Sequence, residues 1–251
     1  DKSFDADGKD LNATPNGSFY TFTSRLGLDV TGPDIGKARS SAKIETDFGG
    51  FSGSNTMLRI RQAYVNLDWG KSAVLVGITW HPLFGAVMPD VLNLSTGAPF
   101  QPFNRSPQIR YQYKANSRVQ LTASVLWQLQ YLSSGPKGMS EDYIKNSCIP
   151  EMFVGADFTP ADGWLMGLGA HMISLKPRTS TEWKEQTFKV NERMTAFSYE
   201  AHLKYSGRNY TFAAKTLMAS ALDHTALLGG YGVSSVRANR DIRLFAILRH
   251  G

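Results

Sequence analysis

The chain has 251 residues, of which 42% are hydrophobic and 19% are charged, and its formal net charge is +6 at pH 7. Its mean hydropathy is −0.26. Together with the lack of any run of roughly 18 consecutive apolar residues, this excludes a membrane protein built from helices. The single cysteine, Cys148, excludes an internal disulfide framework and a cysteine-based zinc site. One large all-β domain is compatible with this length.

The first segment, residues 1–18, is polar and rich in Asp, Asn and Gly, so we expect a polar surface loop there. Residues 19–251 are expected to form the β-domain. No signal peptide precedes the first segment, and the chain stops on a basic stretch where outer-membrane barrels usually have a terminal aromatic residue. We therefore expect the domain to be incomplete at both ends.

Polar and apolar residues alternate along successive segments of the chain. Two neighbouring segments, 108–115 and 118–129, alternate almost without error, and 22–30, 42–48 and 197–205 follow the same pattern. A period of two predicts strands with one polar and one apolar face. The segments have about the length of the roughly 9–11 residues with which a tilted strand crosses a bilayer, whereas soluble strands average about 5–6.

About twelve strands are predicted in chain order. Their ranges are 19–30, 37–48, 57–69, 72–80, 107–115, 117–129, 151–159, 163–174, 190–206, 209–219, 228–236 and 240–249. Tight turns near residues 70, 115, 161 and 207 alternate with long polar connections at 81–106, 130–150 and 175–189. This alternation of short and long connections is typical of bacterial outer-membrane barrels.

The sequence therefore predicts an all-β fold, an antiparallel transmembrane β-barrel. Periodicity alone does not say which face of a strand is inside, so a soluble or surface-exposed β-barrel or sandwich that acts as a binding module remains the alternative. The amount of charge on one row, together with aromatic residues such as Trp69, Trp127 and Trp164 near strand ends, favours the membrane.

Basic residues recur on the polar rows of the predicted strands. Arg59 and Arg61 share one face, Arg110 and Lys114 share one face of a later strand, and Lys43 lies on an earlier strand. Cationic groups on a pore wall lower the barrier for anions and raise it for cations. We expect these five residues to line a pore and bind anions. The alternative is that they merely solvate the lumen, balanced by acidic residues on the same rows.

The connection from His81 to Arg105 is long, rich in Pro, Gly and Phe, and too apolar for a solvated outer loop. Folding into the lumen as a constriction loop satisfies its need to pack. In that position Asp90, Asn93 and Ser95 face the arginines and create a transverse field at the narrowest point. Packing against a neighbouring subunit or over the barrel mouth is the alternative.

Nothing in the sequence indicates an enzyme. None of the five histidines lies in a recognisable Ser/His/Asp arrangement, and His202 and Glu200, which share one polar row, are more typical of polar filler than of catalysis. No metal or cofactor motif is visible, so no catalytic residue, metal or cofactor is expected. Basic residues are interleaved with acidic ones, which argues against a nucleic-acid partner.

Five segments resemble the DcaP-like porins of Gram-negative outer membranes. They are SRLGLDVTGP (24–33), KIETDF (43–48), MLRIRQAYVNLDW (57–69), VLVGITWHPLF (74–84) and NRSPQIRYQY (104–113). The resemblance covers roughly residues 19–115. IPEM (149–152) and LLGGYGV (227–233) are similar to an uncharacterised Bacteroidetes branch.

This resemblance implies a homotrimer of barrels of about sixteen strands each in the lipid of the outer membrane. It also implies passive diffusion of small organic anions, such as dicarboxylates, through an Arg/Lys-lined pore. On the matching segments Arg59, Arg61 and Arg110 are then the best candidates for anion contacts, with Lys43 and Lys114 as secondary ones.

Overall fold

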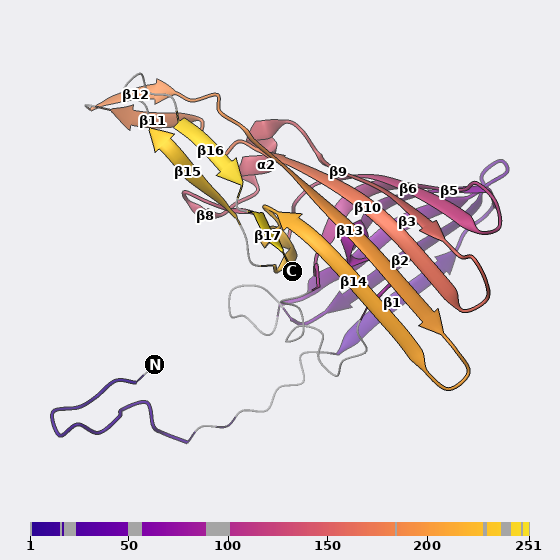
Figure 1. Cartoon of the computed structure of the whole chain (residues 1–251), viewed down its shortest axis with the longest axis horizontal. Helices are drawn as coiled ribbons and strands as arrows, with labels where there is room; N and C mark the ends of the chain where they lie inside the picture. The colour runs from indigo at the N-terminus through magenta and orange to yellow at the C-terminus, as the bar shows by residue number, and fades with distance from the viewer. Residues whose placement is uncertain are drawn as a thin grey trace.

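The computed structural model describes residues 2–15, 17, 24–49, 57–88, 101–183, 185–227, 230–236, 242–246 and 248–250. Eleven strands form one antiparallel sheet in the order β1-β2-β3-β4-β5-β6-β9-β10-β13-β14-β17. Sheet neighbours follow one another along the chain, apart from short local hairpins inserted between them. The sheet is strongly curved (Figure 1).

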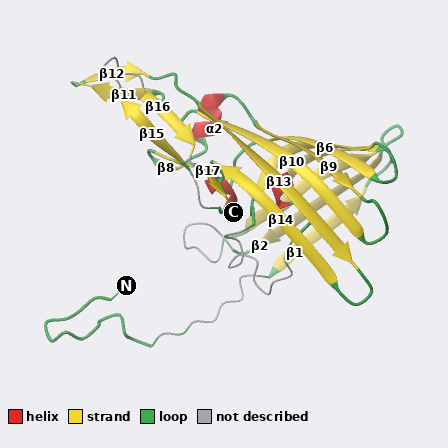
Figure 2. Cartoon of the chain, in the orientation of Figure 1, coloured by secondary structure: helices red, strands yellow, loops and turns green. Residues whose placement is uncertain are grey.

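Strands dominate the described residues, as Figure 2 shows. The sheet consists of β1 (Arg25–Thr31), β2 (Arg39–Asp47), β3 (Arg59–Asp68), β4 (Ser72–Trp80), β5 (Arg105–Lys114), β6 (Val119–Leu126), β9 (Glu151–Phe158), β10 (Trp164–Leu175), β13 (Met194–Ser206), β14 (Thr211–Ser220) and β17 (Leu248–His250). Three hairpins lie outside it: β7 (Ser134–Gly135) with β8 (Gly138–Met139), β11 (Ser180–Trp183) with β12 (Gln186–Lys189), and β15 (Tyr231–Val236) with β16 (Ile242–Ala246). The helical elements are α2 (Asp142–Ser147), η1 (Pro82–Phe84) and η3 (Asp223–Thr225).

Tight turns and long connections lie at opposite ends of the sheet. Residues 69–71, 115–118, 159–163 and 207–210 close the tight turns β3–β4, β5–β6, β9–β10 and β13–β14. The long connections 81–104, 127–150 and 176–193 leave the other end, where the hairpins β11–β12 and β15–β16 project at the upper left of Figure 1. The predicted all-β antiparallel fold and its alternation of short and long connections are confirmed.

Exposure alternates along the strands with the predicted period of two. In β9 the side chains of Met152, Val154 and Phe158 are exposed, whereas Glu151 and Phe153 are buried. The exposed apolar row continues across the sheet with Leu26, Leu28, Ile44, Ile60, Val65, Val76, Ile109, Leu121, Leu168, Phe197 and Phe212. Soluble monomers rarely expose apolar surface of this extent, whereas the lipid-facing bands of outer-membrane barrels are built this way.

The opposite face of the sheet lies on the inside of the curve. Leu126 of β6, Phe153 of β9 and Leu217 of β14 belong to this face and pack in one buried cluster with Leu83 of η1. Strands far apart in the sheet therefore meet across the same interior. This concave face also holds most of the polar and charged residues of the strands.

β3 carries one extra residue relative to β2. Gln62 pairs with Glu45 and Ile60 pairs with Thr46, so Arg61 between them is the inserted residue of a β-bulge. Arg61 and Gln62 consequently both point to the concave face, Arg61 bonded to acidic residues of β2 and Gln62 accepting a hydrogen bond from a threonine of β4. Before the bulge, the odd-numbered residues of β3 point to the concave face, and from Gln62 onward the even-numbered residues do.

The strands predicted near the C-terminal end form, but their pairing differs from the prediction. Segments 228–236 and 240–249 were expected in the wall, but β15 and β16 pair with each other, and only β17 pairs with β14. Alternation of polar and apolar residues predicts that a segment is a strand but does not predict which strand it pairs with. A local hairpin such as β15–β16 is therefore equally compatible with the pattern. Segments 130–150 and 175–189, expected as loops, contain hairpins and α2, and β13 begins at Met194 where the sequence predicts residue 190.

The N-terminal residues 2–15 are mostly exposed and contain one isolated bridge, between Phe4 and Asp10. They extend away from the sheet (Figure 1). In the part of the chain that the structure describes, no helix combines the length and the apolar character needed to cross a membrane.

A charge placed on the exposed apolar face distinguishes a lipid-facing surface from a solvated one. Leu168 of β10 is 68% exposed on that face. We expect Leu168→Lys to lower the free energy of unfolding in lipid vesicles by about 2–4 kcal/mol, because a lysine near the bilayer centre loses its hydration. Urea titration in vesicles measures this change.

The matched control is Asn66→Lys, which adds the same charge on the concave face and is expected to be tolerated. A loss below about 0.5 kcal/mol for Leu168→Lys, the usual effect of a surface substitution in a soluble protein, contradicts a lipid-facing role of the exposed row.

Candidate functional site

Two of the predicted anion-binding arginines are held by carboxylates on the neighbouring strand. Asp47 accepts hydrogen bonds from Nε of Arg59 at 2.9 Å and from Nη1 of Arg61 at 2.7 Å. Nε of Arg61 also donates to the carboxylate of Glu45. The paired acids of β2 and arginines of β3 are 12 to 16 positions apart in the chain, and the antiparallel register and the bulge bring them together. Arg59 and Arg61 face the interior as predicted, but each is paired with an acid.

The two predicted lysines have different partners in different parts of the sheet. Lys43 Nζ pairs with Asp29 Oδ1 of β1 at 2.9 Å. Lys114 lies near the tight-turn end, where its Nζ donates to the carbonyl of Gly70 at 3.2 Å, and it lines a hollow of about 240 Å³ together with Asp68. The structure therefore does not gather the five predicted cations into one site.

Arg110 differs from the other predicted cations. Its guanidinium donates to Gln108 Oε1 from Nε at 3.0 Å and to the carbonyl of Trp80 from Nη2 at 2.6 Å. Among the described residues no carboxylate lies within ion-pair distance of it. Of the three predicted arginines, Arg110 is the one whose charge is not matched by an acid.

Arg110 lines a cavity of about 260 Å³ on the concave face. On the other side of this cavity His202 of β13 lies between two carboxylates, with Nε2 3.1 Å from Asp157 Oδ1 and Nδ1 3.2 Å from Glu200 Oε2. The remaining lining residues include Pro82, Gly85, Ala86, Gln112, Gln120 and Thr122. With the Arg110 guanidinium on one wall and the carboxylates of Asp157 and Glu200 on the other, the cavity has an electric field directed from the arginine toward the carboxylates.

The described ends of the connection 81–105 lie on the concave face. Leu83 and Phe84 are buried, and Lys215 of β14 donates its Nζ to the carbonyls of both residues. Gln101 Nε2 donates to the Phe84 carbonyl at 2.7 Å, which ties the far end of the connection to the near end. The predicted constriction residues Asp90, Asn93 and Ser95 lie outside the described residues.

Aromatic residues anchor this connection beside a buried arginine that the sequence did not single out. Trp80 stacks on Phe84 with ring centroids 4.0 Å apart. The Arg105 guanidinium lies 4.9 Å above the Trp80 ring and donates from Nη2 to Tyr131 Oη at 2.8 Å. The stack holds the base of the connection against the wall.

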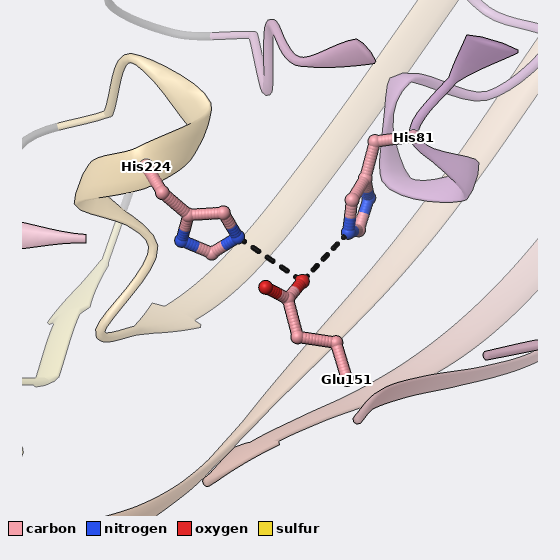
Figure 3. A group of neighbouring side chains, drawn as sticks. All are labelled: His81, Glu151 and His224. Atoms are coloured by element: carbon pink, nitrogen blue, oxygen red, sulfur yellow. Dashed lines mark hydrogen bonds and ion pairs between the residues drawn. The ribbon is translucent and has the colours of Figure 1, made fainter. Parts of the chain in front are cut away.

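Four fully buried side chains meet where this connection joins the wall. His81 follows β4, Glu151 begins β9, His171 belongs to β10 and His224 lies in η3. Nε2 of His81, His171 and His224 lies 3.3, 3.4 and 3.1 Å, respectively, from the same Glu151 oxygen, Oε2. Figure 3 shows the His81 and His224 rings pointing at this carboxylate from two sides.

The pKa values of His81 and His224, the two histidines of the cluster that lie outside the strands, shift in opposite directions. Burial lowers the pKa of His81 to about 4, so its ring is neutral. Burial acts in the same direction on His224, but the charge and the hydrogen bond of Glu151 outweigh it and raise the pKa of that ring above its usual value.

Sequence reasoning missed this cluster because its members are separated by 20 to 73 positions from Glu151 and form no motif. The inward positions of Glu151 and His171 follow from strand alternation. Their meeting with His81 and His224 depends on how two connections fold back onto the concave face.

Comparisons with known proteins bear on the fold. The chain matches no family profile and no curated protein. Among solved structures it is similar to OmpT, an outer membrane protein of Vibrio cholerae, with a TM-score of 0.52 and 12% identity over 79% of this chain and 56% of that one. The OmpT variant lacking loop L8 gives a TM-score of 0.50 and 14% identity over 78% of this chain and 60% of that one. The fold is that of an outer-membrane β-barrel.

The chain spans less than two thirds of the length of either OmpT structure. A Rhodopseudomonas blastica porin mutant also matches 77% of this chain, with 10% identity. Its TM-score is 0.28, so the fold assignment does not rest on it.

The pairing of Arg59 and Arg61 with Asp47 leads to a stability prediction. We expect Asp47→Ala to lower the free energy of unfolding by about 3 kcal/mol, because it leaves two mostly buried guanidinium groups short of a carboxylate. Urea unfolding of the refolded protein in detergent measures this loss.

Asp29→Ala is the control, since it removes the acid of an ion pair whose carboxylate is 74% exposed. Exposed pairs contribute little, so its unfolding midpoint is expected to stay close to that of the wild type. Equal effects of the two substitutions contradict a structural role of the Asp47 pairs.

Proposed function

We propose that the protein is an outer-membrane porin that allows passive diffusion of small anionic solutes. The observation that carries this proposal is the division of the sheet into an exposed apolar face and a polar concave face. In a barrel of the outer-membrane type, such a division places lipid outside and a water-filled lumen inside.

The preference for anions rests on Arg110. Its guanidinium lies on the cavity wall, and among the described residues it has no acidic partner, so its charge remains available to a solute. A planar guanidinium offers a bidentate fork to a carboxylate or phosphate. Arg59 and Arg61, balanced by Asp47 and Glu45, contribute mainly to the field around the passage.

The limit on solute size rests on the inward connection. η1 occupies part of the concave face, and Pro82, Gly85 and Ala86 form one side of the cavity opposite the strand wall. A segment fixed in this position by Lys215 and Gln101 narrows the passage and favours small solutes.

Further parts of the proposal extend the resemblance to DcaP-like porins. They are a location in the outer membrane of a Gram-negative bacterium, assembly as a homotrimer in the lipid, and transport without catalysis or a cofactor. No nucleic-acid partner is proposed, because the inner cations alternate with acids.

Reconstitution in a planar lipid bilayer tests the channel. With a KCl gradient across the membrane, we expect stepwise openings and a reversal potential that indicates chloride preference. A protein that stays dissolved without detergent and opens no channel contradicts the proposal and favours a soluble β-domain that binds a ligand.

Arg110→Gln tests the proposed anion contact. We expect it to shift the reversal potential toward zero while openings persist, because it removes a charge from the cavity wall and keeps a polar side chain there. Arg118→Gln, in the exposed tight turn after β5, removes the same charge outside the cavity and is expected to leave the reversal potential unchanged. Equal shifts for both variants contradict a role for Arg110 beyond net charge.

A further inference from the structure

The cluster of His81, His171, His224 and Glu151 places three ring nitrogens around one carboxylate oxygen. Three imidazole Nε2 atoms lie within 3.4 Å of Glu151 Oε2, which has two lone pairs. The other carboxylate oxygen, Oε1, accepts a hydrogen bond from Gln128 Nε2 at 2.9 Å. Hydrogen bonding alone therefore does not account for the crowding of rings around Oε2.

A metal ion resolves this excess. One lone pair of Oε2 then points to the ion and the second accepts the His171 N–H, while His81 and His224 turn from competing donors into ligands. The candidate ligand atoms of His81, Glu151 and His224 lie within 4.8 Å of one another. Neutral imidazole nitrogens and a carboxylate oxygen are common ligands of zinc.

The distances fit such an ion. In a tetrahedral zinc site with bonds of about 2.0–2.1 Å, ligand atoms are separated by about 3.3 Å. Oε2 lies 3.3 Å from Nε2 of His81 and 3.1 Å from Nε2 of His224. The two nitrogens lie within 4.8 Å of each other.

We propose that His81, His224 and Glu151 bind one divalent transition-metal ion of the zinc type and that His171 positions the carboxylate. The ion joins three segments that the chain keeps far apart: the connection after β4, the first residue of β9, and η3. Binding of the ion does not require channel activity, because the ion acts by fastening two connections to the sheet.

Binding changes one contact in η1. Leu83 N–H donates to His81 Nδ1 at 3.2 Å, so the neutral ring carries its proton on Nε2. An ion on Nε2 leaves the ring proton on Nδ1, where it opposes the Leu83 N–H. We therefore expect the first turn of η1 to shift when the ion binds, which couples the site to the inward connection.

Metal content and binding of Zn²⁺ alone test the proposal. The protein, carrying no polyhistidine tag, is purified in detergent, treated with EDTA and titrated with Zn²⁺. We expect close to one ion per chain after gel filtration, together with a higher unfolding temperature. His81→Ala and His224→Ala are expected to reduce the bound ion to background. Loss of a positioning partner is typically a 10–100-fold effect, so His171→Ala is expected to weaken binding by about that factor.

His202→Ala is the matched control. His202 is also a mostly buried inward histidine beside two carboxylates, but it lies outside the cluster and is expected to leave zinc binding unchanged. Because an alanine variant can fail to fold, Glu151→Gln, which keeps the side-chain shape, serves as a second variant. The visible spectrum of Co²⁺ bound to the wild type serves as a second measurement. No ion bound by the folded wild type, or equal loss in His202→Ala and His224→Ala, overturns the proposal.

Discussion

The strands of the sheet keep an exposed, apolar face and a concave, mostly polar face, and this constraint on register determines the rest of the structure. A slip of one residue moves every side chain of a strand to the opposite face. The register observed between β2 and β3 therefore places Asp47 opposite Arg59 and sets Ile44 and Val65 on the exposed side. Ion pairs inside and apolar surface outside are two results of the same pairing.

The concave face collects charges from strands that are distant in the sheet, and burial requires that these charges find partners. The structure meets this requirement in three ways. Carboxylates hold Arg59 and Arg61, backbone carbonyls of η1 accept from Lys215, and aromatic rings cover the Arg105 guanidinium. The inward connection is thus part of the solution to burying charge, besides being an obstacle in the proposed passage.

Strand positions and the facing of side chains could be predicted from the sequence because both depend on local alternation and turn residues. Segments 108–115 and 118–129 lie where β5 and β6 form, and Arg110 points inward as expected. The pairing of Arg59 with Asp47 needs the inter-strand register, which the sequence does not specify. The hairpin β15–β16 and the histidine cluster depend on how connections fold back, and neither leaves a local pattern.

The bulge at Arg61 divides β3 into two stretches of opposite phase. Up to Arg61 the odd positions face the concave side, and from Gln62 onward the even positions do. Deleting Arg61 would leave a regular strand in the same register with β2, in which Ile60 points outward between the inward Arg59 and Gln62, and Asn66 and Asp68 keep their places on the concave face. The extra residue thus adds one inward guanidinium to the concave face without moving any other side chain of β3 to the opposite face.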